Sequence, residues 1–149
     1  MGKKLYSNVV LDSKLGEGHF GTTWKAHTNE SKNDVADDDQ QPTVVVKVPK
    51  GEVDFKEYRV VLSLLPHRNL VTQLGIAIVG IGKKFCLVSE LCELGSLDQL
   101  HHKMDLTNTT TLTRIIQDLC AGLSHMHDTL EILHKDIACR NLLMRQDKR

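Results

Sequence analysis

The chain has 149 residues, of which 40% are hydrophobic and 26% are charged. This composition is typical of one soluble globular domain and excludes a wholly disordered or collagen-like chain. The 19 basic side chains balance the 19 acidic ones, which argues against a general surface for nucleic acid or anionic lipid. The longest uncharged apolar run, residues 75–82, is too short to span a bilayer, and no apolar stretch near Met1 predicts a secretory signal. We therefore expect reduced cysteines and a cytoplasmic location.

The first part of the sequence predicts the strands of a sheet. Residues 9–15 and 22–28 have the β-branched and apolar composition of two short strands that flank a glycine-rich segment. Residues 30–39 carry five acidic side chains against one lysine, which is typical of a solvated loop. The run of valines in residues 43–48 predicts a third strand that is buried on both faces.

The rest of the sequence predicts two helices and a β-hairpin. Apolar residues recur at helical spacing over 55–65, and this pattern stops before a proline. Residues 70–80 and 85–91 predict a hairpin around a glycine-containing turn. Residues 112–126 place apolar side chains on one face of a second helix. Residues 132–145 predict a loop after it.

Glycines form the first motif that carries chemistry. In the pattern Gly16-x-Gly18-x-x-Gly21, residues without a Cβ allow backbone amides to approach phosphate oxygens. By itself this pattern also fits a glycine-rich hairpin turn. A dinucleotide-binding Rossmann unit is rejected, because a strand pattern and not a helix pattern follows the glycines.

The second motif is Lys47, at the end of the valine run. A lysine inside a buried strand needs an anionic partner to offset its desolvation. Glu57 on the next predicted helix is the first candidate, and Glu52 is the alternative. As isolated features, Lys47 also fits a strand-edge lysine that reaches water, and Glu57 also fits a surface glutamate.

The third motif lies in the loop after the second helix. Asp136 is followed five residues later by Asn141. This pair offers a base for a hydroxyl proton and a carboxamide ligand for magnesium. No spacing of cysteines and histidines matches a structural zinc site. A chance occurrence of this pattern downstream of the other two motifs is very unlikely.

These segments resemble the first part of a protein kinase domain over nearly the whole chain. Residues 15–26 resemble the loop that covers the phosphates, and the segment ending at Lys47 resembles V-A-I-K. Residues 67–71 resemble the H-x-N-[LI]-V stretch, and residues 89–97 resemble the gatekeeper and hinge. The resemblance implies ATP and magnesium as cofactors and a protein substrate.

Finer similarities point to tyrosine kinases. The form Ala138-x-Arg140-Asn141 resembles tyrosine-specific kinases, whereas serine/threonine kinases usually carry a lysine two residues after the aspartate. The acidic insert and residues 95–98 are similar to the Janus-type non-receptor tyrosine kinases. By this resemblance the acceptor would be a protein tyrosine.

The resemblance implies an α+β fold in one partial kinase domain, residues 1–149. Residues 9–94 would form a nucleotide-binding lobe with a five-stranded antiparallel sheet and one helix. Residues 95–149 would form the start of a truncated helical lobe that contains the long helix and the catalytic loop.

The resemblance also implies a role for each site residue. Lys47 would hold the α- and β-phosphates and pair with Glu57. Asp136 would act as the catalytic base, Arg140 would help to position the tyrosine, and Asn141 would bind magnesium. The residues implied to contact the nucleotide are Leu15, Gly16, Gly18, Gly21, Thr23, Val45, Lys47, Ser89, Glu90, Cys92 and Leu143.

Three residues depart from the family pattern. Thr23 replaces a valine and adds a hydroxyl to the roof of the adenine pocket. Val45 replaces an alanine, and such overpacking typically costs about 1–3 kcal/mol. Lys135 replaces an arginine, which could grip a phosphate with two hydrogen bonds. We therefore expect weaker nucleotide binding and weaker control by an activation-loop phosphate.

No D-F-G sequence follows the catalytic loop in residues 142–149, so the magnesium-binding aspartate of the family is missing from these residues. We expect the 149-residue chain to transfer phosphate poorly or not at all. The alternative is a pseudokinase-like regulatory fragment that binds a nucleotide or a partner without catalysis. We also expect the apolar face of the helix at 111–127 to be uncovered, which favours a partner there.

Overall fold

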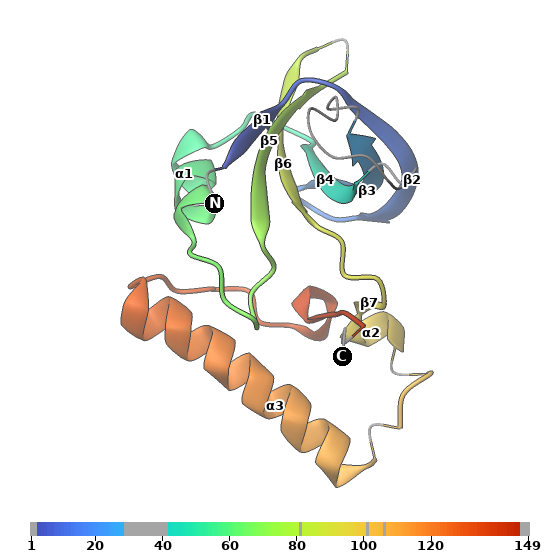
Figure 1. Cartoon of the computed structure of the whole chain (residues 1–149), viewed down its shortest axis with the longest axis vertical. Coiled ribbons are helices and arrows are strands. Elements are labelled where there is room, and N and C mark those ends of the chain that lie inside the picture. The colour runs from blue at the N-terminus through green and yellow to red at the C-terminus, as the bar shows by residue number, and fades with distance from the viewer. Residues whose placement is uncertain (1–2, 29–41, 81, 101, 106, 147–149) are drawn as a thin grey trace, which may run out of the picture. The chain divides into compact units, whose positions relative to one another are not determined.

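The computed structural model describes residues 3–28, 42–80, 82–100, 102–105 and 107–146 (Figure 1). The predicted acidic loop at 30–39 lies outside these residues. The chain divides into two compact units, and each is described by itself below. Unit 1 comprises Met1–Leu64 and Thr72–Leu91, and unit 2 comprises Leu65–Val71 and Cys92–Arg149.

Unit 1 is built on a mixed sheet with the strand order β1-β5-β6-β4-β3-β2. Its strands are β1 Lys4–Tyr6, β2 Val9–Glu17, β3 Gly21–Thr28, β4 Thr43–Pro49, β5 Gln73–Val79 and β6 Lys84–Glu90. The five strands expected from the sequence are present, and neighbouring members of this set pair antiparallel. The sixth strand, β1, was not predicted and runs parallel to β5 (Figure 1).

The core of unit 1 lies on one face of the sheet. Val44 and Val46 are buried, Val45 between them is half-buried, and Lys47 is exposed. The prediction that the valine run is buried on both faces was therefore wrong. The run belongs to an antiparallel sheet, which can keep one face on the core and leave the other open. Residues that share the core are Tyr6, Ala26, Val44, Val46, Ala77, Cys86 and Val88.

Helix α1, Phe55–Ser63, confirms the first predicted helix. It begins where the Asp54 carboxylate accepts a hydrogen bond of 2.8 Å from the backbone N–H of Lys56. Its buried residue, Tyr58, donates its hydroxyl to the carbonyl oxygen of Phe85 at 3.1 Å. Burial raises the pKa of Tyr58 to about 12, so the phenol stays protonated and the hydrogen bond stays intact. This bond ties α1 to β6.

Unit 2 contains two helices and a small two-stranded sheet. Helix α2 is Leu97–Leu100, and the predicted long helix is α3, Thr109–Ser124, which continues into one π-helical turn, His125–Thr129. Strands β7, Gly95–Ser96, and β8, Leu143–Met144, pair antiparallel. The predicted loop at 132–145 therefore contains a short strand as well as a 3-10 turn, Cys139–Asn141.

The segment Leu65–Val71 packs against α3 within unit 2. A Cβ at Gly122 would lie 2.8 Å from the carbonyl oxygen of Asn69, so a glycine permits this close approach. The rings of His67 and His125 stack with centroids 4.6 Å apart. By contrast, Leu112 and Ile116 on α3 are exposed, as expected for the uncovered face of this helix. In the described part of the chain, no helix has the length and apolar character needed to cross a membrane.

Candidate active site

Four of the predicted nucleotide-binding residues share one face of the sheet in unit 1. Thr23 lies directly opposite Lys47 in the β3–β4 pair, and Val45 lies opposite Ser89 in the β4–β6 pair. Directly paired residues project to the same face, and so do Val45 and Lys47, which are two positions apart. The strand register therefore brings together side chains from three strands that the sequence pattern alone could not place side by side.

The glycine-rich segment forms the tip of the β2–β3 hairpin. The backbone N–H of Gly18 donates to the carbonyl oxygen of Gly21 at 2.9 Å. A Cβ at Gly21 would overlap the carbonyl oxygen of Val48, whereas a Cβ at Gly16 or Gly18 would meet nothing within 4 Å. Of these three glycines, the fold requires only Gly21. Gly16 and Gly18 leave open space in front of the backbone, as a loop that lies over phosphates needs.

An ion-pair cluster closes this hairpin tip. Glu17 pairs with Lys14 on its own strand and, at 2.7 Å, with Lys50 just after β4. Because β3 lies between β2 and β4, the pair to Lys50 spans three strands. The backbone N–H of Lys50 also donates to the carbonyl oxygen of Phe20 at 3.4 Å. The hydrogen bonds from Lys14 and then Lys50 lower the pKa of Glu17 to about 2.

An NMR titration of the side-chain carboxyls is expected to give Glu17 a pKa of about 2, below its ordinary value of 4.5. Since the folded-state pKa is depressed, the cluster stabilises the hairpin above about pH 4.5, and this contribution is lost as the pH falls toward 2. Lys14→Met and Lys50→Met should each raise the pKa of Glu17, whereas the matched change Lys103→Met in unit 2 should not. An ordinary pKa in the unmodified chain would contradict the cluster.

Lys47 does not form the predicted ion pair with Glu57 or with the alternative, Glu52. Within the described residues, neither glutamate makes a salt bridge, and the ammonium of Lys47 lies 5.8 Å from the centroid of the Phe20 ring. A cation over an aromatic face is attracted by the ring quadrupole. The tip of the glycine-rich hairpin thus supplies the contact that the sequence assigned to α1.

Two more predicted residues of the nucleotide site lie in unit 1, on β2 and β6. Leu15 is exposed at an irregularity of β2, between Lys14 and Gly16. Glu90, at the end of β6, donates its backbone N–H to Thr72 at 3.0 Å and accepts from the N–H of Thr72 through its carboxylate at 2.7 Å. These two hydrogen bonds fix the end of β6 at Glu90.

Two further predicted nucleotide contacts belong to unit 2. The carbonyl oxygen of Cys92 accepts a hydrogen bond of 3.1 Å from the N–H of Gly95, which closes a turn. Leu143 is exposed on β8, where it pairs with Ser96. The β7–β8 pair therefore fixes Leu143, which follows Asn141 of the catalytic loop by two positions in the chain.

Asp136 is the centre of a hydrogen-bonded loop in unit 2. One of its carboxylate oxygens forms a salt bridge with Arg140, and the other accepts a hydrogen bond of 2.8 Å from Nδ2 of Asn141. The same Nδ2 also donates to the main-chain oxygen of Asp136 at 2.8 Å. All three predicted catalytic residues of this loop therefore meet at one carboxylate.

This arrangement also orients the carboxamide of Asn141. Since its nitrogen donates to Asp136, its Oδ1 is left as an acceptor that makes no protein hydrogen bond in the described part of the structure. Amide and carboxylate oxygens are the ligands that magnesium prefers. The Oδ1 atom of Asn141 therefore fits the predicted role of a magnesium ligand.

The catalytic loop is held on several sides within unit 2. Lys135 has a positive φ of 62°, and the N–H of Asp136 donates to Nδ1 of His134 at 3.3 Å. The N–H of Leu97, at the start of α2, donates to the carbonyl oxygen of Leu142 at 2.8 Å. The guanidinium of Arg145 donates to the carbonyl oxygen of Arg68 at 3.2 Å. The backbone around Asp136 is thus fixed by neighbours on both sides of the motif.

Comparison with known proteins identifies the family. The family described as protein tyrosine and serine/threonine kinase matches residues 9–149. The chain belongs to the protein kinase family. The range covers the glycine-rich hairpin, Lys47 and the loop around Asp136, so the family resemblance and the α+β fold expected from the sequence are confirmed. Strand β1 precedes the matched range.

Several kinases are similar to this chain. A G-type lectin S-receptor-like serine/threonine-protein kinase of Arabidopsis thaliana is 33% identical over 93% of the chain and 16% of its own length. A dual specificity protein kinase of Dictyostelium discoideum, pyk3, is 30% identical over 99% of the chain and 10% of its own length. LIM domain kinase 1 of Drosophila melanogaster is 28% identical over 95% of the chain and 11% of its own length. The chain thus spans only a small part of these relatives.

Sequence reasoning missed three contributors to the kinase site. Lys14 and Lys50 pair with Glu17, and Phe20 lies under the ammonium of Lys47. The only sequence signal was the opposite charge at Lys14 and Glu17, three positions apart. Lys50 lies far along the chain from Glu17, and only the strand order brings the two together.

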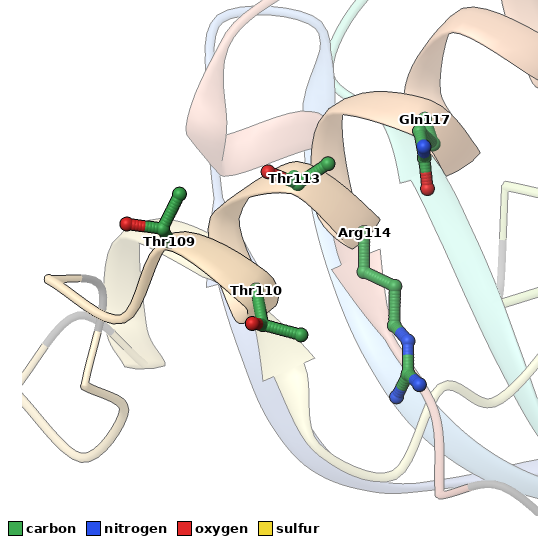
Figure 2. A pocket seen from close by; sticks show the side chains of 5 residues that line it. All are labelled: Thr109, Thr110, Thr113, Arg114 and Gln117. Atoms are coloured by element: carbon green, nitrogen blue, oxygen red, sulfur yellow. The ribbon is translucent and has the colours of Figure 1, made fainter.

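A hollow on α3 is lined by residues that belong to none of the kinase motifs. Figure 2 shows its lining, which comes from the first turns of this helix. The lining residues are Thr109, Thr110, Thr113, Arg114 and Gln117. None of them is a predicted site residue, and the carboxamide of Asn108 already caps the N–H groups of Thr110 and Thr111. Elsewhere in the described ranges, no group of three His, Cys, Asp or Glu side chains is placed to hold a metal ion.

Proposed function

We propose that this kinase chain binds ATP with magnesium and carries the residues for phosphoryl transfer to a protein tyrosine. The observation that carries the proposal is the Asp136 carboxylate, which Arg140 and Asn141 hold from two sides. Such positioning supplies most of the catalysis in phosphoryl transfer. In the reaction the bond between the γ-phosphorus and the bridging oxygen breaks, and a bond to the acceptor oxygen forms. The acceptor proton goes to Asp136.

The nucleotide half of the site is proposed to lie on the open face of the sheet in unit 1. Lys47 would neutralise the α- and β-phosphates, and the backbone of Gly16 and Gly18 would approach phosphate oxygens. Thr23 and Val45, on the same face as Lys47, would contact the base. Bound magnesium would supply charge neutralisation at the phosphates, and Oδ1 of Asn141 is the oxygen proposed to hold it.

Tyrosine as the acceptor is the finer part of the proposal. Serine/threonine and dual-specificity kinases are among the relatives, so the proposal rests on the loop itself. Position 138 holds an alanine, where serine/threonine kinases usually carry a lysine. The cation that contacts Asp136 is instead the guanidinium of Arg140. The test is NMR of the 149-residue chain with ATP and matched peptides that differ only in tyrosine, serine or threonine. We expect the tyrosine peptide alone to shift the signals of Arg140; equal shifts with the serine peptide would refute this choice.

ATP binding is the first test of the proposed function. We expect ATP with magnesium to raise the melting temperature of the chain, because a ligand that binds only the folded state stabilises it. Lys47→Met should weaken ATP binding about tenfold or more, since a hydrogen bond to a charged group contributes about 1.5–3 kcal/mol. The control Lys103→Met removes an exposed lysine of unit 2 and should leave the affinity unchanged. The absence of a shift at millimolar ATP would refute nucleotide binding.

We propose that the 149-residue polypeptide, which contains no D-F-G sequence, binds ATP but transfers phosphate very slowly. A radiolabelled-ATP assay that gives turnover in this polypeptide, and loss of that turnover in Asp136→Asn, would overturn this expectation. The alternative function is a pseudokinase-like module that binds a partner. The exposed Leu112 and Ile116 on α3 favour it, and it would remain if ATP did not bind.

A further inference from the structure

Strand β1 is a feature of this chain that the family match does not include. Lys4–Tyr6 lie before residue 9, where the match begins. Nevertheless Tyr6 is only 8% exposed and belongs to the core of unit 1. Lys4, Leu5 and Tyr6 pair in parallel with Gly75, Ile76 and Ala77 of β5. The residues before the family match thus complete the sheet.

The edge of β5 is shaped to receive this strand. A Cβ at Gly75 would overlap the carbonyl oxygen of Lys4 and approach its N and C atoms to 2.8 Å. Only a glycine allows the two backbones to come this close. Next to Gly75 the β5–β6 register shifts, between Gln73 and Gly75. The close approach is therefore a local adaptation of β5 to β1.

Lys3, just before β1, connects this strand to α1. Its ammonium donates to the carbonyl oxygen of Gln73 at 2.5 Å and lies 3.5 Å from the carbonyl oxygen of Leu64. Leu64 is the C-cap of α1, and the last turn of α1 has no basic residue of its own. A cation at a helix C-terminus interacts favourably with the exposed carbonyls and the helix dipole. Partial burial lowers the pKa of Lys3, as expected for a group packed against these carbonyls.

We infer that Lys3 is a positioning residue that fixes the C-terminal end of α1 to β5, and that β1 carries it to this place. The functional part of this inference rests on the proposed nucleotide binding. Glu57 lies in the first turn of α1, at the end opposite to Leu64. A helix held at Leu64 has less freedom to move, and with it Glu57, relative to the sheet that carries Lys47. Lys3 thereby controls how often α1 supplies its carboxylate to the nucleotide site.

The structural part is tested by hydrogen exchange on the 149-residue chain without nucleotide. In Lys3→Met, the amides of residues 61–64 should exchange roughly three- to tenfold faster, while β4 and β6 keep their protection. Lys3→Arg retains the charge and donors and should restore slow exchange. Lys56→Met removes a lysine from the other end of the same helix and serves as the matched control. Equal exchange in Lys3→Met and Lys56→Met would overturn the inference.

A second variant tests the strand independently of Lys3. Gly75→Ala should displace β1, so that the amides of residues 4–6 and 61–64 both lose protection. If residues 4–6 lose protection while residues 61–64 keep it, α1 does not depend on β1 and the inference fails. A general loss of protection across β3 and β4 would show a sheet effect, and Lys3→Met with its arginine rescue then decides alone.

The functional part is tested by ATP affinity in the same variants. Lys3→Met should weaken ATP binding roughly two- to fivefold, with recovery in Lys3→Arg, because fewer molecules hold α1 in the competent position. If the unmodified chain binds no ATP, the proposed function fails. The hydrogen-exchange result still tests whether Lys3 fixes the C-terminal end of α1. If ATP binds and Lys3→Met changes the exchange but not the affinity, Lys3 fixes the helix without acting on the site, and the functional part is refuted.

Discussion

Gly21→Ala is expected to destabilise unit 1 by about 1–3 kcal/mol, which is the usual cost of overpacking. A Cβ at this position overlaps the carbonyl oxygen of Val48 on the neighbouring strand and comes within 3.2 Å of Pro49. The obstacle is backbone, so no side-chain rotation can relieve it. The β3–β4 pair would have to separate at its end, where Gly21 is in register with Pro49.

Gly18→Ala is the matched control for this prediction. A Cβ at Gly18 meets nothing within 4 Å, and its φ is not positive. Such a change is neutral or stabilises by up to about 1 kcal/mol, because it restricts the unfolded chain. Urea unfolding of both variants gives the comparison. If Gly21→Ala were as stable as Gly18→Ala, the close approach of Val48 would be wrong.

The two glycines should also differ in the opposite sense toward nucleotide. Gly18→Ala places a methyl group in the space that phosphates are proposed to occupy, so ATP affinity should fall although stability does not. Normal stability with weak ATP binding in Gly18→Ala would show that Gly18 serves nucleotide binding, whereas Gly21 serves the fold. Normal ATP affinity in Gly18→Ala would place the phosphates elsewhere.

Val46→Asp is expected to abolish the cooperative unfolding transition of unit 1. Val46 is 0% exposed at the centre of the core. A buried carboxyl without a partner costs several kcal/mol, about as much as the whole stability of a small domain. Val10→Asp makes the same change on β2 at a site that is 51% exposed, and it should shift stability by about 0.5 kcal/mol or less.

A milder substitution keeps this prediction measurable. Val46→Ala should fold and should lose roughly 1–3 kcal/mol in urea unfolding, because it leaves a cavity in the core. The neighbour Val45, on the opposite face and half-buried, should tolerate the same change with a smaller loss. Equal losses at the two positions would support burial on both faces and contradict the one-sided core.

The sequence predicted those parts of the fold and site that have a local signal. The glycines, Lys47, Asp136 and Asn141 occur at spacings that their chemistry requires, and the predicted strands and both helices are found close to their expected bounds. The one-sided burial of β4 was not predictable from its valines, since four β-branched residues in a row fit either kind of sheet.

What the sequence could not predict depends on distant partners. Strand β1 contains only Lys4, Leu5 and Tyr6, too few residues for a periodic pattern, and its partner Gly75 lies far along the chain. The expected pair between Lys47 and Glu57 depends on where α1 sits, which follows from packing against β5 and β6 and not from either residue. The role of Phe20 has no sequence signal, because nothing in its neighbours indicates the cation above its ring.

The place of residues 65–71 in unit 2 has a consequence for how the chain assembles during synthesis. These residues lie between α1 and β5, both in unit 1, yet Asn69 packs against Gly122 of α3. Strands β5 and β6 precede α3 in the chain and therefore leave the ribosome before it. These two strands are therefore available to join the sheet before the loop that precedes them has its docking surface on α3. Since the chain crosses between units three times, no single proteolytic cut can release either unit as a separate piece.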